Sequence, residues 1–258
     1  MDIRFDGQVA WLSGAASGMG LLFSENFVSL GGSVVMCDLN EDTLSAAVDK
    51  INAIREGAAI GVKCDVRDYE QVCHARDEAV RVYGRIDVVI PFAGGAELRM
   101  LGVGGALEFP DIPIEVFDWS LDVNLRGQFY FSHAAMKVMR EQKSGVVIHV
   151  GSISGEEGSA NNVGYATSKS AAMNGLTKSV AQFGGKYGIR CCCVAPGPVL
   201  TRPGMANMAT MMGRAADPQE MIDLILFLAS DKAAFITGIT VLADGGRNLM
   251  MRKTYKKD

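Results

Sequence analysis

A tyrosine and a lysine four residues apart, with a serine upstream, are the side chains best placed for acid–base chemistry. Tyr165 and Lys169 lie in the stretch Tyr165-Ala166-Thr167-Ser168-Lys169, and Ser152 precedes the tyrosine by thirteen residues. Residues four apart on a helix share one face. A phenol with a pKa of about 10 is a poor base at neutral pH, but a neighbouring ammonium favours the phenolate. The serine hydroxyl would orient and polarise a substrate oxygen.

A glycine-rich turn near the start of the chain is typical of a dinucleotide site. Gly14, Gly18 and Gly20 follow an apolar run and open an amphipathic segment. Glycines at these positions permit a tight turn and let a pyrophosphate approach N–H groups at the positive end of a helix. The alternative interpretation is a structural turn that binds nothing.

Asp38 makes the dinucleotide prediction more specific. It ends the second apolar run, 18 residues after Gly20, where a carboxylate binds both hydroxyls of the adenosine ribose. The same charge repels a 2′-phosphate, by a few kcal/mol for charges about 4 Å apart at an effective dielectric of about 20. No Lys or Arg occurs at positions 15–19 or 39–40 to bind that phosphate. The sequence therefore predicts NAD rather than NADP.

Short apolar runs alternate with longer amphipathic segments along the whole chain. This alternation predicts an α/β, doubly wound parallel β-sheet (a Rossmann fold) in a single domain spanning 1–258. The expected strands are Val9–Ser13, Ser33–Cys37, Ala59–Lys63, Ile86–Ile90, Val146–Gly151, Ile189–Val194 and Thr240–Leu242. The expected helices are Gly20–Leu30, Glu41–Glu56, Asp68–Tyr83, Ile114–Glu141, Gly164–Tyr187 and Asp217–Ala229.

Two long segments, 94–113 and 196–214, follow strands at the carboxyl edge of the predicted sheet. Ligands of doubly wound folds bind at that edge, and loops of this length are usually functional. The second segment is rich in proline and methionine. We expect it to form a substrate lid at about 196–215.

Together these motifs resemble those of the classical short-chain dehydrogenase/reductase family, over nearly the whole chain. Asp65 matches the family's aspartate near the adenine, and Asn124 matches the helix asparagine of its proton relay. The resemblance implies that Asn124, Ser152, Tyr165 and Lys169 are catalytic. The cofactor-binding residues it implies are Gly14, Ser17, Gly18, Met19, Gly20, Asp38, Leu39, Asp65, Val66, Ala93, Gly94, Tyr165, Lys169, Pro196, Gly197, Val199 and Thr201.

The resemblance also implies the reaction, which is hydride transfer between a secondary alcohol or ketone and NAD. Tyr165 would exchange a proton with the substrate oxygen while Ser152 hydrogen-bonds that oxygen. Lys169 would lower the tyrosine pKa and hold the nicotinamide ribose, and Asn124 would anchor a water that leads protons out. A homotetramer or homodimer is the expected assembly.

Two stretches depart from the family pattern. Pro91-Phe92-Ala93-Gly94 stands where the family has Asn-Asn-Ala-Gly, and a proline cannot donate a ladder hydrogen bond. We therefore expect the sheet and the cofactor contact to differ there. His149 and Gly151 replace the usual Asn and Ser before Ser152. We expect His149 to make a structural hydrogen bond rather than to act in catalysis.

The substrate is less constrained than the cofactor. The loop after Ser152 is polar, and Arg99, Glu157 and Arg202 are candidate substrate residues in the surrounding loops. These features favour a polyol, sugar or sugar acid, whereas the methionine-rich lid suits a hydrophobic, steroid-like ketone. Two further alternatives are an NADP-dependent carbonyl or imine reductase and a non-catalytic dinucleotide-sensing protein.

The overall composition excludes several other classes of protein. Among 258 residues, 25 Lys and Arg against 29 Asp and Glu give a net charge of −4, so we expect no nucleic-acid or membrane partner. No charged-then-apolar leader and no long apolar run occurs in the sequence. Six cysteines without a CxxC pair predict free thiols and no metal site. These features predict a cytoplasmic protein.

Overall fold

A sheet of parallel strands forms the centre of the molecule. The computed structural model describes residues 2–97, 102, 107–201 and 203–250. Within these residues, seven parallel strands lie in the order β3-β2-β1-β4-β5-β6-β7. The strands are β1 (Val9–Ser13), β2 (Ser33–Asp38), β3 (Ala59–Lys63), β4 (Val88–Pro91), β5 (Gly145–Val150), β6 (Ile189–Pro196) and β7 (Thr240–Ala243). The predicted doubly wound fold is confirmed.

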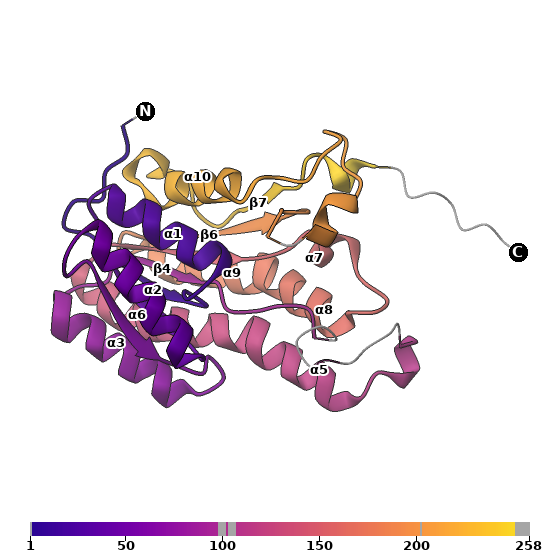
Figure 1. The fold of residues 1–258 in the computed structure, drawn as a ribbon, viewed down its shortest axis with the longest axis horizontal. Coiled ribbons are helices and arrows are strands. Elements are labelled where there is room, and N and C mark those ends of the chain that lie inside the picture. The colour runs from indigo at the N-terminus through magenta and orange to yellow at the C-terminus, as the bar shows by residue number, and fades with distance from the viewer. Residues whose placement is uncertain (1, 98–101, 103–106, 202, 251–258) are drawn as a thin grey trace, which may run out of the picture.

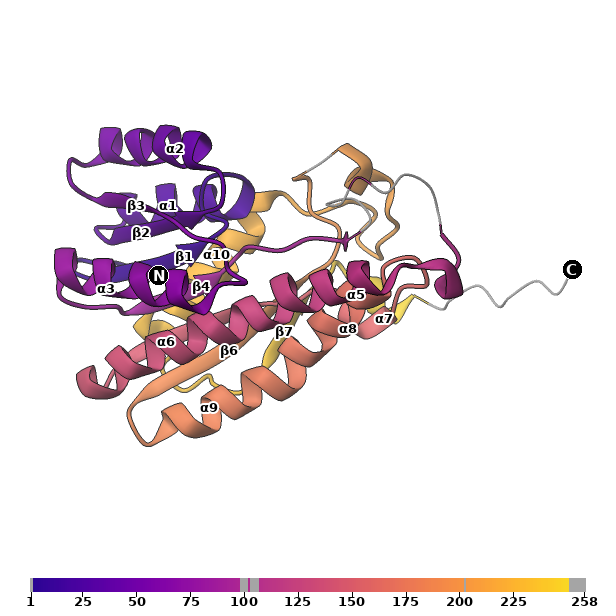
Figure 2. The same ribbon diagram turned by 90° about the horizontal axis from the view of Figure 1, so that it is seen from below.

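Helices cover both faces of the sheet, as Figures 1 and 2 show. One face packs against α1 (Gly18–Ser29), α2 (Glu41–Ile54) and α10 (Pro218–Ala229). The other face packs against α3 (Tyr69–Tyr83), α6 (Gly127–Gln142) and α9 (Thr177–Gly185). In the described part of the chain, the remaining α-helices are α5 (Ile114–Leu121), α7 (Ser154–Glu157) and α8 (Val163–Ala171). Figure 2 shows α5 and α8 extending past the carboxyl edge of the sheet, and α8 contains Tyr165 and Lys169.

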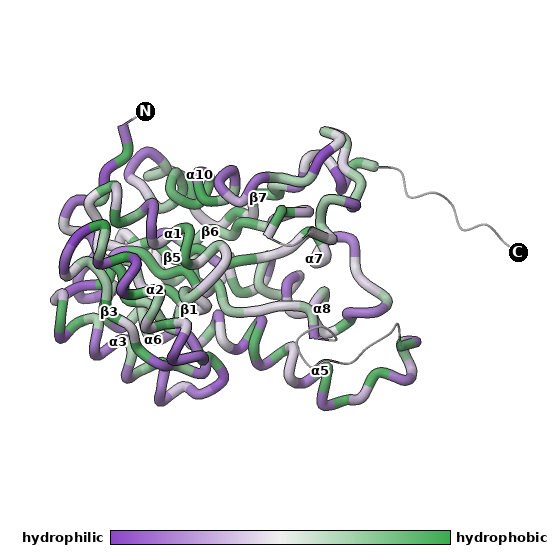
Figure 3. The backbone as a smooth tube through the Cα atoms, viewed as in Figure 1, coloured by the Kyte–Doolittle hydropathy of each residue, from purple (hydrophilic) through white to green (hydrophobic). Residues whose placement is uncertain are grey.

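The core explains why these short segments form strands. Residues of β1 and β4 are buried throughout, because strands covered on both faces are almost continuously apolar. Figure 3 shows apolar chain concentrated at the centre and hydrophilic chain in the outer loops. Among the described residues, no helix has the length and apolarity needed to cross a membrane.

Two helices expected to be continuous are each interrupted by a π-helical turn. The turn η2 (Asp122–Arg126) separates α5 from α6, and η3 (Ala172–Leu176) separates α8 from α9. A π turn adds one residue between hydrogen-bonded groups and is frequent at functional sites. Hydrophobic periodicity predicted the helical segments but not these local insertions.

Candidate active site

A cleft of about 740 Å³ opens at the carboxyl ends of the strands. All of the residues predicted to bind the cofactor line it, and so do Ser152, Tyr165 and Lys169. Asn124 lies beneath the surface of the cleft, completely buried. The chain thus brings the glycine turn, Asp38 and the predicted catalytic residues to one site.

The glycine turn leaves room for close approach between backbones. Gly14 has φ +61°, and a Cβ added there would lie 2.7 Å from the N atom of Ala93. A Cβ on Gly20 would lie 2.3 Å from the carbonyl oxygen of Gly14. Ser17 caps α1 without a side-chain hydrogen bond, so the first N–H groups of this helix remain available to an anion. This cradle fits the pyrophosphate of a dinucleotide.

Asp38 is held at the edge of the glycine turn. Its Oδ2 accepts a hydrogen bond from the Ala16 N–H at 3.1 Å, and its Oδ1 accepts one from the Asn40 N–H at 3.2 Å. Each oxygen accepts one N–H and keeps a further lone pair, so the carboxylate can still accept hydrogen bonds from ribose hydroxyls. The side chain is therefore oriented before any ligand arrives.

The far end of the cleft carries an ion pair that sequence reasoning missed. Arg67 lines the cleft, and its Nη2 lies 2.6 Å from Oδ2 of Asp65. Hydrogen bonds from the Arg67 side chain lower the pKa of Asp65. The Arg67 guanidinium is thus fixed beside the wall formed by Cys64, Asp65 and Val66.

Lys169 is buried, and its ammonium is held by one backbone carbonyl. Lys169 Nζ donates to Val150 O at 2.8 Å and lies 5.5 Å from the centre of the Tyr165 ring. Burial lowers the pKa of Lys169 from 10.5 to about 8, because desolvation disfavours the charged form. The lysine can therefore place a positive charge beside the phenol, or titrate close to physiological pH.

Asn124 ties the π turn η2 to the loop that follows β4. Its Oδ1 accepts from the Gly95 N–H at 2.9 Å, and its Nδ2 donates to Gly95 O at 3.1 Å. Nδ2 also lies 3.1 Å from Ser120 O and 3.2 Å from Ser120 Oγ. A side chain with this many fixed partners positions the segment around Gly95, which lines the cleft.

Glu97 is a buried polar residue that the sequence patterns did not single out. Its carboxylate accepts from the Tyr165 N–H at 3.2 and 3.0 Å and from Ser120 Oγ at 3.3 Å. It is 1% exposed, at the N-terminal end of α8, where the helix dipole favours a negative charge. A single acidic residue in a glycine-rich stretch carries no periodic signal, so only the folded structure reveals this contact.

His149 has the structural role predicted for it. It is completely buried, and its two ring nitrogens lie 2.8 Å from Ser132 Oγ and 2.9 Å from Thr177 Oγ1. Burial, with a smaller contribution from the charge of Lys169, lowers its pKa to about 3. Neutral at ordinary pH, His149 supplies hydrogen bonds beneath the site rather than a proton to it.

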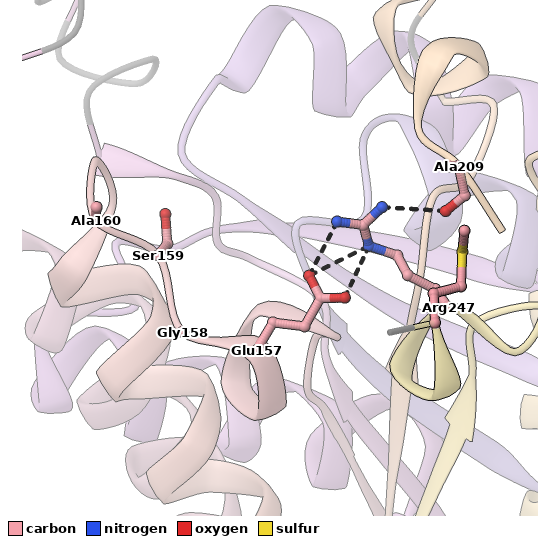
Figure 4. A pocket seen from close by; sticks show the side chains of 7 residues that line it. Glu157, Gly158, Ser159, Ala160, Ala209 and Arg247 are labelled. Atoms are coloured by element: carbon pink, nitrogen blue, oxygen red, sulfur yellow. Dashed lines mark hydrogen bonds and ion pairs between the residues drawn. The ribbon is translucent and has the colours of Figure 1, made fainter. Parts of the chain in front are cut away.

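Of the three predicted substrate residues, Glu157 alone is among the described residues; Arg99 and Arg202 lie outside them. Glu157 lines a second pocket of about 380 Å³, which shares Ser159 with the main cleft. Figure 4 shows Glu157 and Arg247 pointing toward one another there. Arg247 Nε lies 2.9 Å from a Glu157 carboxylate oxygen, and Arg247 Nη1 donates to Ala209 O at 3.0 Å. Arg247, which sequence reasoning missed, thereby joins α7, the predicted lid and the C-terminal segment.

Comparisons with known proteins agree with the fold and indicate the family. A family model described as Enoyl-(Acyl carrier protein) reductase matches residues 14–248. The trans-4-hydroxycyclohexanecarboxylate dehydrogenase of Sinomonas cyclohexanicum is 37% identical, over 93% of this chain and 92% of the relative. The D-threitol dehydrogenase of Mycolicibacterium smegmatis is 31% identical, over 95% of this chain and 94% of the relative. The solved structure of a 7α-hydroxysteroid dehydrogenase complexed with NADH and 7-oxo glycochenodeoxycholic acid has a TM-score of 0.83 and 28% identity, covering 95% of this chain and 96% of that one.

The fold, the glycine turn and the Ser-Tyr-Lys set define an oxidoreductase that acts on alcohols or ketones with a nicotinamide dinucleotide. The chain belongs to the classical short-chain dehydrogenase/reductase family.

Proposed function

We propose that this chain is an NAD-dependent dehydrogenase that interconverts a secondary alcohol and its ketone. The observation that carries the proposal is a single cleft lined by the glycine turn, Asp38, Ser152, Tyr165 and Lys169. The bound nicotinamide would supply the hydride acceptor or donor. The protein would supply orientation, proton transfer and electrostatic stabilisation.

Each side chain has a role that follows from its surroundings. Tyr165 removes the hydroxyl proton of the alcohol, because the Lys169 ammonium stabilises its phenolate. Ser152 donates to the substrate oxygen and fixes its position. Asn124 holds the loop at Gly95 beside the cleft, and its relay role implied by family resemblance is part of the proposal.

Asp38 supports NAD as the cofactor. Its carboxylate is already oriented by the Ala16 and Asn40 N–H groups, and a 2′-phosphate placed beside it would meet a like charge. The competing candidate, an NADP-dependent reductase, needs a cation where this carboxylate lies.

The cleft walls favour a substrate that carries polar groups on an aliphatic frame. Ser154, Ser159 and Asn162 line the cleft, as do the methionines Met205 and Met208. The relatives named above act on a hydroxycyclohexanecarboxylate and on threitol, which are aliphatic alcohols with further polar groups. We therefore retain polyols, sugars and sugar acids as the first class to test, with hydroxycyclohexanecarboxylates added. A steroid-like ketone remains the alternative that the methionines favour.

A fluorescence titration with NADH and NADPH tests the cofactor assignment. We expect NADH to bind at least tenfold more tightly, and the double variant Asp38→Ala, Leu39→Arg to reverse much of this preference. Equal or tighter NADPH binding by the unmodified protein would overturn the assignment. Failure to bind either dinucleotide would favour a non-catalytic role.

Replacing Tyr165 with Phe tests the reaction itself. The variant keeps the ring but loses the hydroxyl, so turnover of any alcohol oxidised with NAD should fall by at least about 10³-fold. The NADH dissociation constant should change less than threefold, because the glycine turn and Asp38 are untouched. An equal loss of turnover and NADH affinity would contradict the assigned role.

Localisation and assembly complete the proposal. All six cysteines are free thiols, which supports a reducing, cytoplasmic compartment. The predicted lid at 196–215 includes Met205 and Met208, which line the cleft. We further propose that the chain assembles with copies of itself.

A further inference from the structure

The hydrogen-bond ladder between β4 and β5 ends early. The two strands pair only at Val88 with Val146 and at Val89 with Val147. The Val146 N–H donates to Asp87 O at 2.8 Å, and in a parallel pair the donors that face one neighbour recur at every second residue. The β4 residues that face β5 alternate in the same way, so after Val89 the next β4 donor would be residue 91, whose N–H would bond to the Ile148 carbonyl and carry the ladder on toward Val150. Pro91 has no N–H to continue the ladder.

Beyond the last β4–β5 pair, the side chain of Gln128 makes the hydrogen bonds to Val150 that a longer β4 would make. Its Oε1 accepts from the Val150 N–H at 3.0 Å, and its Nε2 donates to Val150 O at 3.2 Å. Nε2 also donates to Asn124 O at 2.7 Å, at the π turn η2. Gln128 is completely buried. One amide thus holds both backbone groups of Val150 and the carbonyl of Asn124.

Val150 O is also the acceptor that holds the Lys169 ammonium, at 2.8 Å. The orientation of this carbonyl therefore determines where the lysine charge lies relative to Tyr165. Other titratable groups around Lys169 are Tyr165 on the same helix, His149 on β5 and Cys193 on β6. Neither His149 nor Cys193 carries a charge at neutral pH, because burial lowers the pKa of the first and raises the pKa of the second to about 12.

We propose that Gln128 is a positioning residue for Lys169, acting through the Val150 carbonyl where Pro91 has ended the β4–β5 ladder. Its effect on turnover rests on the proposed function, since it presumes that Lys169 serves the reaction. Its effect on the position of the Lys169 ammonium does not depend on the proposed function.

The chain offers a matched control on the same helix. Gln142 makes the same pair of bonds to Ile86, accepting from its N–H at 3.0 Å and donating to its carbonyl at 2.8 Å. Gln142 is the last residue of α6, whereas Gln128 is in its first turn, so Gln142 clamps the opposite edge of the sheet. Gln142→Leu removes an equivalent clamp without touching the cleft.

The experiment compares Gln128→Leu, Gln128→Glu and Gln142→Leu. The titration of Lys169 is followed by NMR in protein labelled with ¹³C-lysine, with Lys169→Arg used to assign the signal. Gln128→Leu should lower the lysine pKa by at least half a unit, because the acceptor carbonyl is no longer held. Gln128→Glu keeps the acceptor for the Val150 N–H and adds a carboxylate beside the same carbonyl, so it should raise that pKa. Gln142→Leu should leave it unchanged.

Turnover gives the second readout, with the melting temperature measured in parallel. Gln128→Leu should reduce kcat for alcohol oxidation at least tenfold. The pH at which kcat increases should also become higher, because a displaced Lys169 ammonium stabilises the Tyr165 phenolate less. Gln142→Leu should lower the melting temperature but keep the kcat profile.

The outcomes separate this inference from the proposed function. If the Lys169 titration and the kcat profile are the same in Gln128→Leu and Gln142→Leu, Gln128 is merely structural and the inference is overturned. If Gln128→Leu does not fold, Gln128→Glu decides through the sign of the lysine shift. If the lysine shifts as expected but the unmodified protein oxidises no alcohol, the inference stands and the proposed function fails.

Discussion

Lys169, which lines the cleft, and His149, which does not, are both buried, and desolvation lowers the pKa of both. Sequence reasoning found both residues, the first by its spacing from Tyr165 and the second as a departure from a family pattern. It did not find Gln128 or Glu97, because the partners of these side chains are backbone groups that come together only in the folded chain. Spacing identifies residues that act on one helix face, whereas contacts between distant segments leave no local pattern.

His149 makes the stability of the fold sensitive to acid. Its pKa is 6.5 in an unfolded chain and about 3 in the folded one. Between these values the unfolded state binds more protons, so stability is lost as the pH falls below 6.5. At pH 5 the loss is about 2 kcal/mol for a shift of this size.

His149→Asn should remove most of this loss. We expect the difference in unfolding free energy between pH 7 and pH 5, from urea titrations, to shrink by about 1–2 kcal/mol. His74→Asn, at an exposed position on α3, is the control and should leave that difference unchanged. A pH dependence identical in the two variants would argue against the neutral, buried state of His149.

The helices α5 and α8 both bond to the side chain of Glu97, through Ser120 and the Tyr165 N–H respectively. The amphipathic pattern predicted both helices, yet it could not predict the π turns η2 and η3 that follow them. A π turn shifts the hydrogen-bond partners by one residue while the side-chain pattern stays helical. The N-terminal end of α8 is therefore held partly by a residue outside α5 and α8.

Glu97→Gln and Glu97→Ala separate the charge of this residue from its hydrogen bonds. Gln keeps an acceptor for the Tyr165 N–H and should cost about 1 kcal/mol of stability through the lost charge at the N-terminus of α8. Ala leaves buried donors unpaired and should cost about 2–3 kcal/mol, with kcat reduced at least tenfold because Tyr165 lies in that first turn. Urea unfolding and alcohol oxidation measure the two effects. A normal kcat in Glu97→Ala would rule out a positioning role.

Arg247 connects three elements around the second pocket. Its bonds to Glu157 and to the carbonyl of Ala209 tie the predicted lid to α7. Arg247→Met should release the lid, and we expect KM for the alcohol to rise several-fold while kcat changes less than threefold. Arg81→Met is the control, because Arg81 makes an ion pair with Glu78 within α3, away from the lid. Steady-state kinetics showing the same small effect in both variants would exclude a latch at Arg247.

For the whole molecule, the order of the predicted strands and helices along the chain was enough to predict the fold class. Alternating strands and helices, joined by right-handed crossovers, allow few arrangements, and a parallel sheet with helices on both faces is observed. The strand β1 begins and ends where the apolar run predicted. The strand β4 begins two residues later than predicted and ends at Pro91. Composition could not predict contacts between copies, since these depend on the finished surface.

The edge strand β7 presents such a surface. All four of its residues are only half-buried, Phe235 is fully exposed, and Ile239 is 43% exposed. Exposed sheet edges and apolar patches are usually covered, and we expect a second copy of this chain to cover this one. Light scattering after size exclusion should give the mass of a homotetramer or a homodimer. Phe235→Asp should lower that mass with an unchanged circular-dichroism spectrum, whereas Val82→Asp on α3 should not. A monomeric unmodified protein would refute the proposed assembly, and equal masses for all three proteins would exclude this face from the interface.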